Sequence, residues 1–410
     1  MSGIDCFRPM VIFKYVLLIV TVPVLMARAE PIAEGSSKFL GNITNGTPQS
    51  NYADYWNQIT LENGGKWEAV QPSNQSSFNW GQTDAAYNYC KEKGWPYKHH
   101  CFVWGNQQPG WVNSSNARSA VENYIRTFGE KYPDCYMIDV VNEPLHAPAK
   151  YKDGLGGNGS TGWDWVITVF EMARKYCPKS KLILNDYGIV NDGNATRRYL
   201  EIINLLKDRE LIDMIGVQSH YFNLENVRTS TIQDNLDALA ETGLPITSSE
   251  FDLRGDENTQ LDRYKTYFPL FWEHPAVVGV TLWGYTNNWG GAIIMSGGRE
   301  YAALKWLRTY VDSMENVEHT SIQTPKAVDV ATVPVTVSFS GGNALSVRLS
   351  SPDRITVTVV NPNGEMIVRS SFRMISREQT ITLPENSLSP GVYAVMVKGL
   401  DFQVVRQVVR

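Results

Sequence analysis

The sequence predicts an α/β protein: a (β/α)8 TIM barrel followed by a small all-β, sandwich-like C-terminal domain. Three observations support this fold class. Between about residues 38 and 316, short apolar runs alternate with stretches of helical periodicity, which is typical of a parallel sheet. The alternation provides eight candidate strands, the number that closes a barrel of this kind. Beyond about residue 315 the helical periodicity ends and only strand signals remain.

The strands of the barrel are expected where apolar and β-branched residues cluster. These segments are Phe39–Thr44, Trp56–Thr60, Tyr97–Trp104, Tyr136–Asn142, Lys181–Leu184, Met214–Tyr221, Pro245–Glu250 and Val277–Trp283. Apolar residues at three- and four-residue spacing predict helices between them, at Arg118–Tyr132, Trp163–Tyr176, Arg197–Lys207, Ile232–Glu241 and Gln260–Glu273. A doubly wound open sheet is the competing architecture.

The C-terminal region, residues 334–410, contains seven short candidate strands. They are Val335–Phe339, Ser346–Leu349, Ile355–Val360, Met366–Phe372, Thr380–Leu383, Val392–Val397 and Phe402–Val409. Asn361-Pro362-Asn363-Gly364 predicts a hairpin turn, because Asn and Gly tolerate positive φ. Many short strands in a small segment favour an immunoglobulin-like sandwich. The preceding residues 317–333, which bear Thr, Val and Pro, are expected to form a linker.

The first 29 residues have the pattern of a signal peptide. Arg8 and Lys14 come before an apolar run, and the small-x-small site Ala27-Arg28-Ala29 follows it. The barrel is then expected to occupy residues 30–316 of a secreted or cell-surface protein. A membrane anchor is the alternative, but the run is short and has no charged stop-transfer flank. We therefore expect no membrane span in the mature chain.

The composition favours a neutral ligand. The chain has 410 residues and a formal net charge of −5, whereas nucleic-acid partners need clustered Lys and Arg. Twelve Trp and twenty Tyr provide flat apolar faces with polar edges, which suit a sugar-binding cleft, although most of them are expected in the core.

Four cysteines remain once Cys6 leaves with the signal peptide: Cys90, Cys101, Cys135 and Cys177. In an oxidising compartment they allow three pairings, and buried free thiols remain an equal alternative. Their spacing fits no zinc pattern, and no His and Asp cluster has ligand spacing. We therefore predict neither a metal nor another cofactor.

Polar or aromatic side chains end most of the predicted barrel strands: Trp104, Glu143, Asp186, Gln218, His220, Glu250 and Trp283. In a barrel these strand ends converge on one face. Hydrolysis of a glycosidic bond needs a proton donor and a second carboxylate. Glu143 and Glu250, on strands four and seven, are the two candidates and are expected to face each other across the barrel mouth. A solvated surface Glu is the alternative reading for either residue taken alone.

The neighbours of the two glutamates support this reading. Asn142 offers an amide to the 2-hydroxyl of a sugar, a contact that strengthens in the transition state. His220 and Gln218, on strand six beside strand seven, are expected to fix the Glu250 carboxylate.

Eight motifs at predicted strand ends carry a resemblance to a known family. They are Thr60-Leu61-Glu62-Asn63 with Lys66-Trp67-Glu68, His100-Cys101-Phe102-Val103-Trp104, Pro109-Gly110-Trp111, Asp139-Val140-Val141-Asn142-Glu143-Pro144, Asn185-Asp186-Tyr187, Gln218-Ser219-His220, Ser249-Glu250-Phe251-Asp252 and Leu282-Trp283-Gly284. The span from about 38 to 315 thereby resembles glycoside hydrolase family 10.

The resemblance implies a retaining endo-β-1,4-xylanase that hydrolyses internal bonds of xylan by double displacement. Glu143 then corresponds to the general acid/base and Glu250 to the nucleophile, with the carboxyl groups about 5 Å apart. The resemblance also implies a binding shell for xylan or xylo-oligosaccharides. Its residues are Glu62, Asn63, Lys66, His100, Trp104, Asn142, Gln218, His220 and Trp283, with Trp289 as a further wall residue.

Two departures from the family pattern are visible. Gly105, followed by Asn106-Gln107-Gln108, stands where the family often has His, so a subsite is expected to differ. The Gly-rich segment Tyr151–Trp163 is expected to form a loop beside the cleft. A cellulase, mannanase or galactanase on the same barrel remains an alternative, as does a secreted sugar-binding protein without catalysis.

The C-terminal domain is similar to sorting domains of the type IX secretion system. The resemblance rests on Asn361-Pro362-Asn363-Gly364-Glu365, on Leu388-Ser389-Pro390-Gly391-Val392-Tyr393 and on a last strand with Arg406 and Arg410. It implies secretion machinery as a partner. A carbohydrate-binding module is the alternative, although the segment has no Trp and only Tyr393 for stacking on sugars.

Overall fold

The computed structural model describes residues 30–286 and 294–319, followed by seven strands between residues 336 and 409. The segment expected as a signal peptide, the wall residue Trp289 and most of the expected linker lie outside the described residues. None of the described helices combines the length and the apolar character that a membrane span requires.

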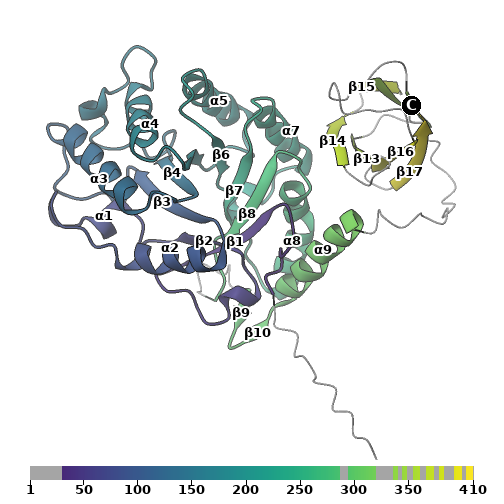
Figure 1. Cartoon of the computed structure of the whole chain (residues 1–410), viewed down its shortest axis with the longest axis horizontal. Coiled ribbons are helices and arrows are strands. Elements are labelled where there is room, and N and C mark those ends of the chain that lie inside the picture. The colour runs from purple at the N-terminus through teal and green to yellow at the C-terminus, as the bar shows by residue number, and fades with distance from the viewer. Residues whose placement is uncertain are drawn as a thin grey trace, which may run out of the picture.

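Eight parallel strands form a closed barrel (Figure 1). The strands are β1 Phe39–Thr44, β2 Gln58–Leu61, β3 Tyr97–Val103, β4 Met137–Asn142, β5 Lys181–Asp186, β6 Met214–Val217, β7 Ile246–Phe251 and β8 Val277–Leu282. Strand β1 pairs with β8 in parallel register, Phe39 opposite Gly279. This closing pair confirms the predicted barrel and excludes a doubly wound open sheet.

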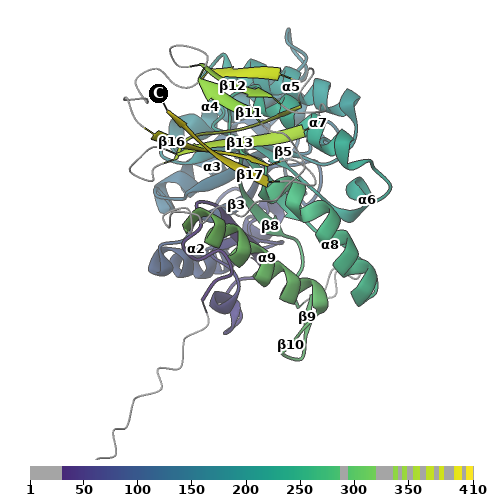
Figure 2. The ribbon, with the colours of Figure 1, turned by 90° about the vertical axis from the view of Figure 1, so that its right-hand side faces the viewer.

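Helices cover the outside of the barrel. They are α1 Trp67–Val70, α2 Gly81–Lys93, α3 Ala117–Lys131, α4 Asp164–Tyr176, α5 Gly193–Lys207, α6 Tyr221–Leu224, α7 Thr229–Ala240, α8 Glu257–Trp272 and α9 Ala302–His319. Short 3-10 turns lie at Tyr52–Asp54 and Lys152–Leu155, and a small hairpin joins β9 Met295–Ser296 to β10 Arg299–Glu300. Figure 2 shows α8 and α9 side by side on the outer surface. All five predicted helices are present.

Several predicted strands differ from the observed ones in their bounds, and strands six and two show why. Strand six was expected to reach Tyr221, but β6 ends at Val217 and Tyr221 begins α6. The Tyr221 amide donates to the Asp252 carboxylate (3.3 Å) where the chain has left the sheet. Strand two was expected from Trp56, which instead lies buried against the Tyr285 ring, 5.4 Å between centroids.

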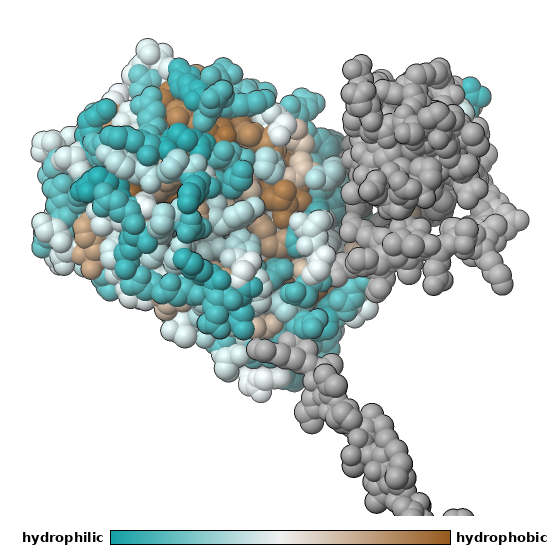
Figure 3. Space-filling model, viewed as in Figure 1, coloured by the Kyte–Doolittle hydropathy of each residue, from teal (hydrophilic) through white to brown (hydrophobic). Residues whose placement is uncertain are grey.

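The barrel strands are buried on both faces, because helices cover the outside and side chains fill the inside. Hydrophilic residues dominate the barrel face in Figure 3, and hydrophobic residues show mainly in the upper middle of that view. Cys90, Cys101, Cys135 and Cys177 are buried free thiols, which decides between the two alternatives left by the sequence. Burial raises the pKa of each of these thiols.

Seven strands follow the barrel, as predicted: β11 Thr336–Phe339, β12 Ala344–Arg348, β13 Arg354–Val360, β14 Met366–Arg373, β15 Glu378–Thr382, β16 Val392–Lys398 and β17 Gln403–Val409. They form two antiparallel sheets, β11-β12-β15 and β14-β13-β16-β17. Alternate residues are buried on the central strands β13 and β16, with Val357 and Val359 buried on the first and Val395 and Val397 on the second. One buried face per sheet is typical of a sandwich. The hairpin partners β13 and β14 pair as expected, and their turn lies outside the described residues.

Candidate active site

Two buried glutamates lie at the C-terminal ends of barrel strands. Glu143 directly follows β4 and is 9% exposed, whereas Glu250 lies within β7 and is 5% exposed. The backbone φ of Glu143 is +54°, a left-handed conformation that is uncommon for a residue other than glycine. Such conformations cost free energy and cluster at functional sites. Both carboxylates are therefore held by surroundings that outweigh the cost of burying them.

Three neutral donors surround the Glu143 carboxylate. The Trp104 indole Nε1 donates to Oε2 (2.9 Å), and Gln218 Nε2 donates to Oε1 (3.2 Å). Asn142 Nδ2 makes a longer contact with Oε1 (3.4 Å). Burial and the negative charge of Glu250 raise the pKa of Glu143 to about 7, against the lowering effect of Trp104 and Gln218. Glu143 therefore holds its proton up to about pH 7, where an ordinary glutamate is already ionised.

Glu250 has a charged partner instead. Asn185 Nδ2 donates to its Oε1 (2.9 Å), and His220 Nε2 lies 3.2 Å from its Oε2. Burial on its own would raise the pKa of Glu250. The hydrogen bond from His220 and the positive charges of His100, His220 and Lys98 outweigh burial and lower it to about 2. Glu250 is therefore ionised.

His220 lies between two carboxylates. Its Nδ1 is 2.6 Å from Asp252 Oδ1, and its Nε2 faces Glu250. Burial lowers the pKa of His220, but the hydrogen bonds to Asp252 and Glu250 outweigh burial and raise it to about 9. The protonated imidazole donates from both nitrogens. The partly buried Arg254 donates from Nε to the other Asp252 oxygen (3.1 Å) and so extends this charge network.

Two amides connect the glutamates. Asn185 Nδ2 donates to Asn142 Oδ1 (2.8 Å) as well as to Glu250, and Asn142 faces Glu143. The Ser249 hydroxyl donates to Asn185 Oδ1 (2.5 Å) and fixes the orientation of this amide. The sequence reasoning did not identify Asn185 as a site residue, although it lies at a strand end. The adjacent Asp186 is directed elsewhere and binds His146 Nδ1 (2.7 Å).

A charged layer lies beneath the glutamates. Lys98 Nζ and His100 Nδ1 both contact Asp139 Oδ2, at 3.0 and 2.8 Å, and all three side chains are buried. The His100 ring is 5.5 Å from the Trp283 ring in a T-shaped arrangement, and the His220 ring is 6.3 Å from the same indole. These contacts fix Trp283 as an aromatic wall beside Glu250.

A second wall lies beside Glu143. Lys66 Nζ is 5.0 Å from the centroid of the Trp104 ring and donates to Asn63 Oδ1 (3.1 Å) and Gln107 Oε1 (2.7 Å). Gln107 belongs to the segment that departs from the family pattern, and the sequence reasoning did not assign it to the site. Its carboxamide fixes the Lys66 ammonium over Trp104.

The predicted binding residues fall into two contacting groups. Asn142, Gln218 and Trp104 contact Glu143, with Lys66 and Asn63 behind Trp104, whereas His220 contacts Glu250 and packs with His100 on Trp283. One expectation was wrong: Gln218 donates to Glu143 and not to Glu250. Gln218 and His220 both lie between the end of β6 and the start of α6, and they reach different carboxylates.

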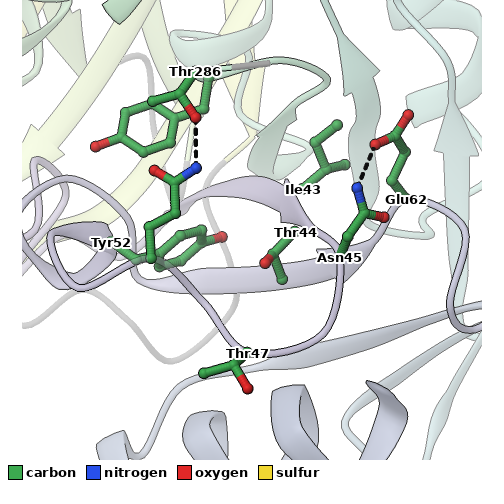
Figure 4. Close-up of a pocket in the computed structure, with 9 residues that line it drawn as sticks. Ile43, Thr44, Asn45, Thr47, Tyr52, Glu62 and Thr286 are labelled. Atoms are coloured by element: carbon green, nitrogen blue, oxygen red, sulfur yellow. Dashed lines mark hydrogen bonds between the residues drawn. The ribbon is translucent and has the colours of Figure 1, made fainter. Parts of the chain in front are cut away.

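Glu62 lies at the edge of this site, in a pocket between the ends of β1, β2 and β8 (Figure 4). Asn45 Nδ2 donates to Glu62 Oε2 (3.1 Å), and Gln49 Nε2 donates to Thr286 Oγ1 (2.5 Å). No group of three metal-binding side chains lies together in the part of the chain that the structure describes.

Comparison with known families agrees with this geometry. The family model described as "Glycosyl hydrolase family 10" matches residues 32–295. The chain belongs to glycosyl hydrolase family 10. A second model, "Secretion system C-terminal sorting domain", matches residues 341–410. Both resemblances inferred from the sequence are confirmed, and the barrel is a glycoside hydrolase domain.

Relatives with curated descriptions extend the comparison. The chain is 39% identical over 286 residues to Endo-1,4-beta-xylanase B of Cellvibrio japonicus, a match that covers 66% of this chain and 45% of that protein. It is 30% identical over 270 residues to an endo-1,4-beta-xylanase of Agaricus bisporus, covering 62% of this chain and 79% of the relative. The chain thus spans less than half the length of the first relative.

The fold also matches solved structures. Native xylanase 10B from Thermotoga maritima aligns with a TM-score of 0.61 at 22% identity, covering 70% of this chain and 98% of that one. A structure described as GH10 from Paenibacillus barcinonensis aligns with a TM-score of 0.61 at 21% identity, covering 73% and 100%. At this level of identity the likeness concerns the fold.

Proposed function

We propose that this protein is a secreted retaining endo-β-1,4-xylanase, with Glu143 as general acid/base and Glu250 as nucleophile. The observation that carries the proposal is the opposite ionisation of two buried carboxylates in one hydrogen-bonded site, with a pKa of about 7 for Glu143 and about 2 for Glu250. A pair of carboxyl groups driven to different proton states by their surroundings is the arrangement that glycosidases use. The names of the relatives support xylan as the substrate.

In the first step, the Glu250 carboxylate attacks the anomeric carbon and forms a glycosyl ester. The Glu143 carboxylic acid gives its proton to the departing glycosidic oxygen. The proposed shell would hold the sugars on either side of this bond, with Trp104, Trp283 and Trp289 offering ring faces and Asn142 facing a 2-hydroxyl.

In the second step, water attacks the anomeric carbon and the ester bond to Glu250 breaks. Glu143, now a carboxylate, takes the proton of that water. Esterification removes the Glu250 charge, and after burial that charge is the next largest cause of the raised Glu143 pKa. The pKa of Glu143 therefore falls once the glycosyl ester has formed. Glu143 then stays ionised after it has given up its proton, and a carboxylate is the form that can act as general base. Two successive displacements retain the anomeric configuration.

The polar residues of the proposed shell have types that suit a chain of xylose units. Glu62, Asn63, Lys66, His100, Gln218 and His220 provide acceptors and donors for hydroxyls. Xylose has no exocyclic hydroxymethyl group, which leaves its ring faces and its ring hydroxyls for recognition. Trp104 and Trp283 would contact the ring faces, and the polar residues of the shell would contact the hydroxyls. A panel of xylan, cellulose, mannan and galactan with reducing-sugar measurement tests this choice, and release from another polymer in preference to xylan contradicts it.

We assign residues 1–29 to a signal peptide, 30–316 to the catalytic barrel, 317–333 to a linker and 334–410 to a sorting domain for the secretion machinery. The match of residues 341–410 to a sorting-domain model supports export to the medium or cell surface. Removal of residues 317–410 is expected to keep xylan hydrolysis in cell extracts and abolish it in the medium. An unchanged distribution contradicts the sorting role.

Azide rescue tests the roles of the two glutamates. Glu250→Ala is expected to abolish xylan hydrolysis, and azide attacking an activated aryl xylobioside in the vacated space gives a glycosyl azide of inverted configuration. Glu143→Ala is expected to retain glycosylation of Glu250 with such a good leaving group, so azide then attacks the intermediate and gives a product of retained configuration. NMR of the anomeric proton distinguishes the two azides, and the reverse pattern would exchange the roles.

A further inference from the structure

The pocket beside Glu62 offers a binding place that the catalytic residues do not use. Polar side chains of Asn45, Thr47, Gln49, Glu62 and Thr286 line it, and Tyr52 and Ile43 are also part of its wall (Figure 4). We propose that this pocket binds a single neutral sugar branch, a pentose substituent carried by the xylan backbone, and excludes an acidic one. This inference rests on the proposed function and names the substituted form of its substrate.

The position of the pocket places it next to the cleft. In the closed barrel β1 lies between β8 and β2, and the pocket is formed where these three neighbouring strands end. Glu62 precedes Asn63, which binds Lys66, and Lys66 lies over the Trp104 ring that holds Glu143. On the other side, Thr286 follows Trp283 by three residues. A sugar unit bound between Trp104 and Trp283 would therefore have the pocket beside it.

The pocket is separate from the bond-breaking centre. None of its lining residues makes a hydrogen bond to Glu143 or Glu250 among the described contacts. Its volume of about 200 Å³ is below the 300 Å³ or more that is typical of sites for drug-sized ligands. The space therefore suits one monosaccharide and not a further stretch of backbone.

Hydrogen-bonding groups in the pocket suit sugar hydroxyls. Asn45 donates its amide to Glu62, and within the described residues its Oδ1 and the Thr47 hydroxyl have no protein partner. An acceptor and a hydroxyl that both face open space can pair with the donors and acceptors of a furanose or pyranose ring.

The charge of the pocket selects against acids. Glu62 provides a carboxylate, and no Lys or Arg is present among the described residues that line the space. A uronic acid branch would bring a second negative charge beside Glu62 without a counter-ion, which costs free energy in a partly desolvated site. A neutral arabinofuranosyl unit carries no such cost.

Filling the pocket provides the test. Thr47→Trp introduces a large ring at an exposed residue that has no hydrogen bond to lose among the described contacts. Ser50→Trp is the matched control, because it places the same ring three residues further along the same loop and outside the pocket lining. The full chain and both variants are compared on linear xylohexaose, on the same backbone with one arabinofuranosyl branch, and with one 4-O-methylglucuronosyl branch. Mass spectrometry of the products locates the branch relative to each cut.

We expect Thr47→Trp to lower kcat/KM on the arabinosylated substrate by about 10-fold or more, through KM, in the mode of cleavage that places the branch beside Glu62. Linear xylohexaose is expected to change less than about 2-fold, and Ser50→Trp to behave as the unaltered protein on every substrate. The glucuronosylated substrate is expected to be cut only where its branch lies elsewhere.

Three results overturn the inference while leaving the xylanase proposal intact. Equal losses of kcat/KM in Thr47→Trp on the linear and arabinosylated substrates would assign the pocket to the backbone. The other two are no loss of kcat/KM on either substrate, and cuts by the unaltered protein that place the glucuronosyl branch beside Glu62. Absence of hydrolysis of linear xylohexaose by the unaltered protein would instead refute the proposed function itself. Equal thermal unfolding temperatures of the two Trp variants serve as the folding control.

Discussion

The proton on Glu143 can be followed through Trp104. Burial is the larger cause of its raised pKa and the Glu250 charge is the second. A rise from the ordinary value of 4.5 to about 7 corresponds to about 3 kcal/mol of preference for the protonated form. Glu250→Gln removes the charge and keeps the shape, so it is expected to lower the pKa of Glu143 by on the order of one pH unit.

The assay uses the hydrogen bond from the Trp104 indole to Glu143 Oε2, 2.9 Å in length. Loss of the Glu143 proton strengthens this bond, because charge-assisted hydrogen bonds are shorter and stronger. The ¹⁵N and ¹H shifts of the Trp104 indole, assigned with Trp104→Phe, are therefore expected to titrate near pH 7. In Glu250→Gln the midpoint moves to lower pH, and Glu143→Gln removes the titration.

Two results would refute this reasoning. An indole signal that titrates near pH 4.5 in the unaltered protein would mean that burial does not hold the proton on Glu143. A midpoint that stays or rises in Glu250→Gln would mean that the two carboxylates do not sense each other, and the proposed change of role between the two steps would lose its basis.

Three further predictions follow from the same contacts. Because the folded-state pKa of Glu143 is raised, its contribution favours folding at low pH and is lost as pH rises from 4.5 through about 7. Glu143→Gln is therefore expected to be more stable than the unaltered protein at pH 8, by up to about 3 kcal/mol, but not at pH 4. Urea unfolding at both pH values checks this expectation. His220→Asn removes the charge that lowers the pKa of Glu250, so the acidic limb of the kcat/KM profile is expected to move upward, and an unmoved limb contradicts the role of His220. Exhaustive chelation with EDTA is expected to leave xylan hydrolysis unchanged, since both proposed steps use carboxylates alone.

The sequence predicts the barrel well because each strand is a local pattern. All eight strands are present, since a short β-rich run between helical stretches is recognisable without its neighbours. Helix α2 was not predicted. Only four of its residues are buried, among them Tyr87 and Cys90, so its apolar stripe is weak. The sequence predicts the ends of strands less well. At the end of β6 the Tyr221 amide donates to Asp252, and a contact between residues so distant in sequence is not visible in a local pattern.

The pairing of side chains across the barrel mouth cannot be obtained from strand alternation. Alternation says that Gln218 and His220 share a face, but the stagger of neighbouring strands determines which carboxylate each one meets. Gln218 was therefore expected at Glu250 and is found at Glu143. Asn185 was missed for the same reason. Its role depends on hydrogen bonds from β5 to both Asn142 and Glu250, which lie on other strands.

One short segment accounts for much of the difference between the two glutamates. Both are nine-tenths or more buried, so burial acts on each in the same direction. After β6 ends at Val217, the residues that follow place a neutral Gln218 amide on Glu143 and the charged His220 ring on Glu250. A neutral donor stabilises a carboxylate less than an imidazolium does, so burial prevails at Glu143 and charge prevails at Glu250. The different pKa values of the two glutamates, on which their proposed roles rest, thus depend on which residue types occupy two positions after β6, in addition to the placement of the glutamates.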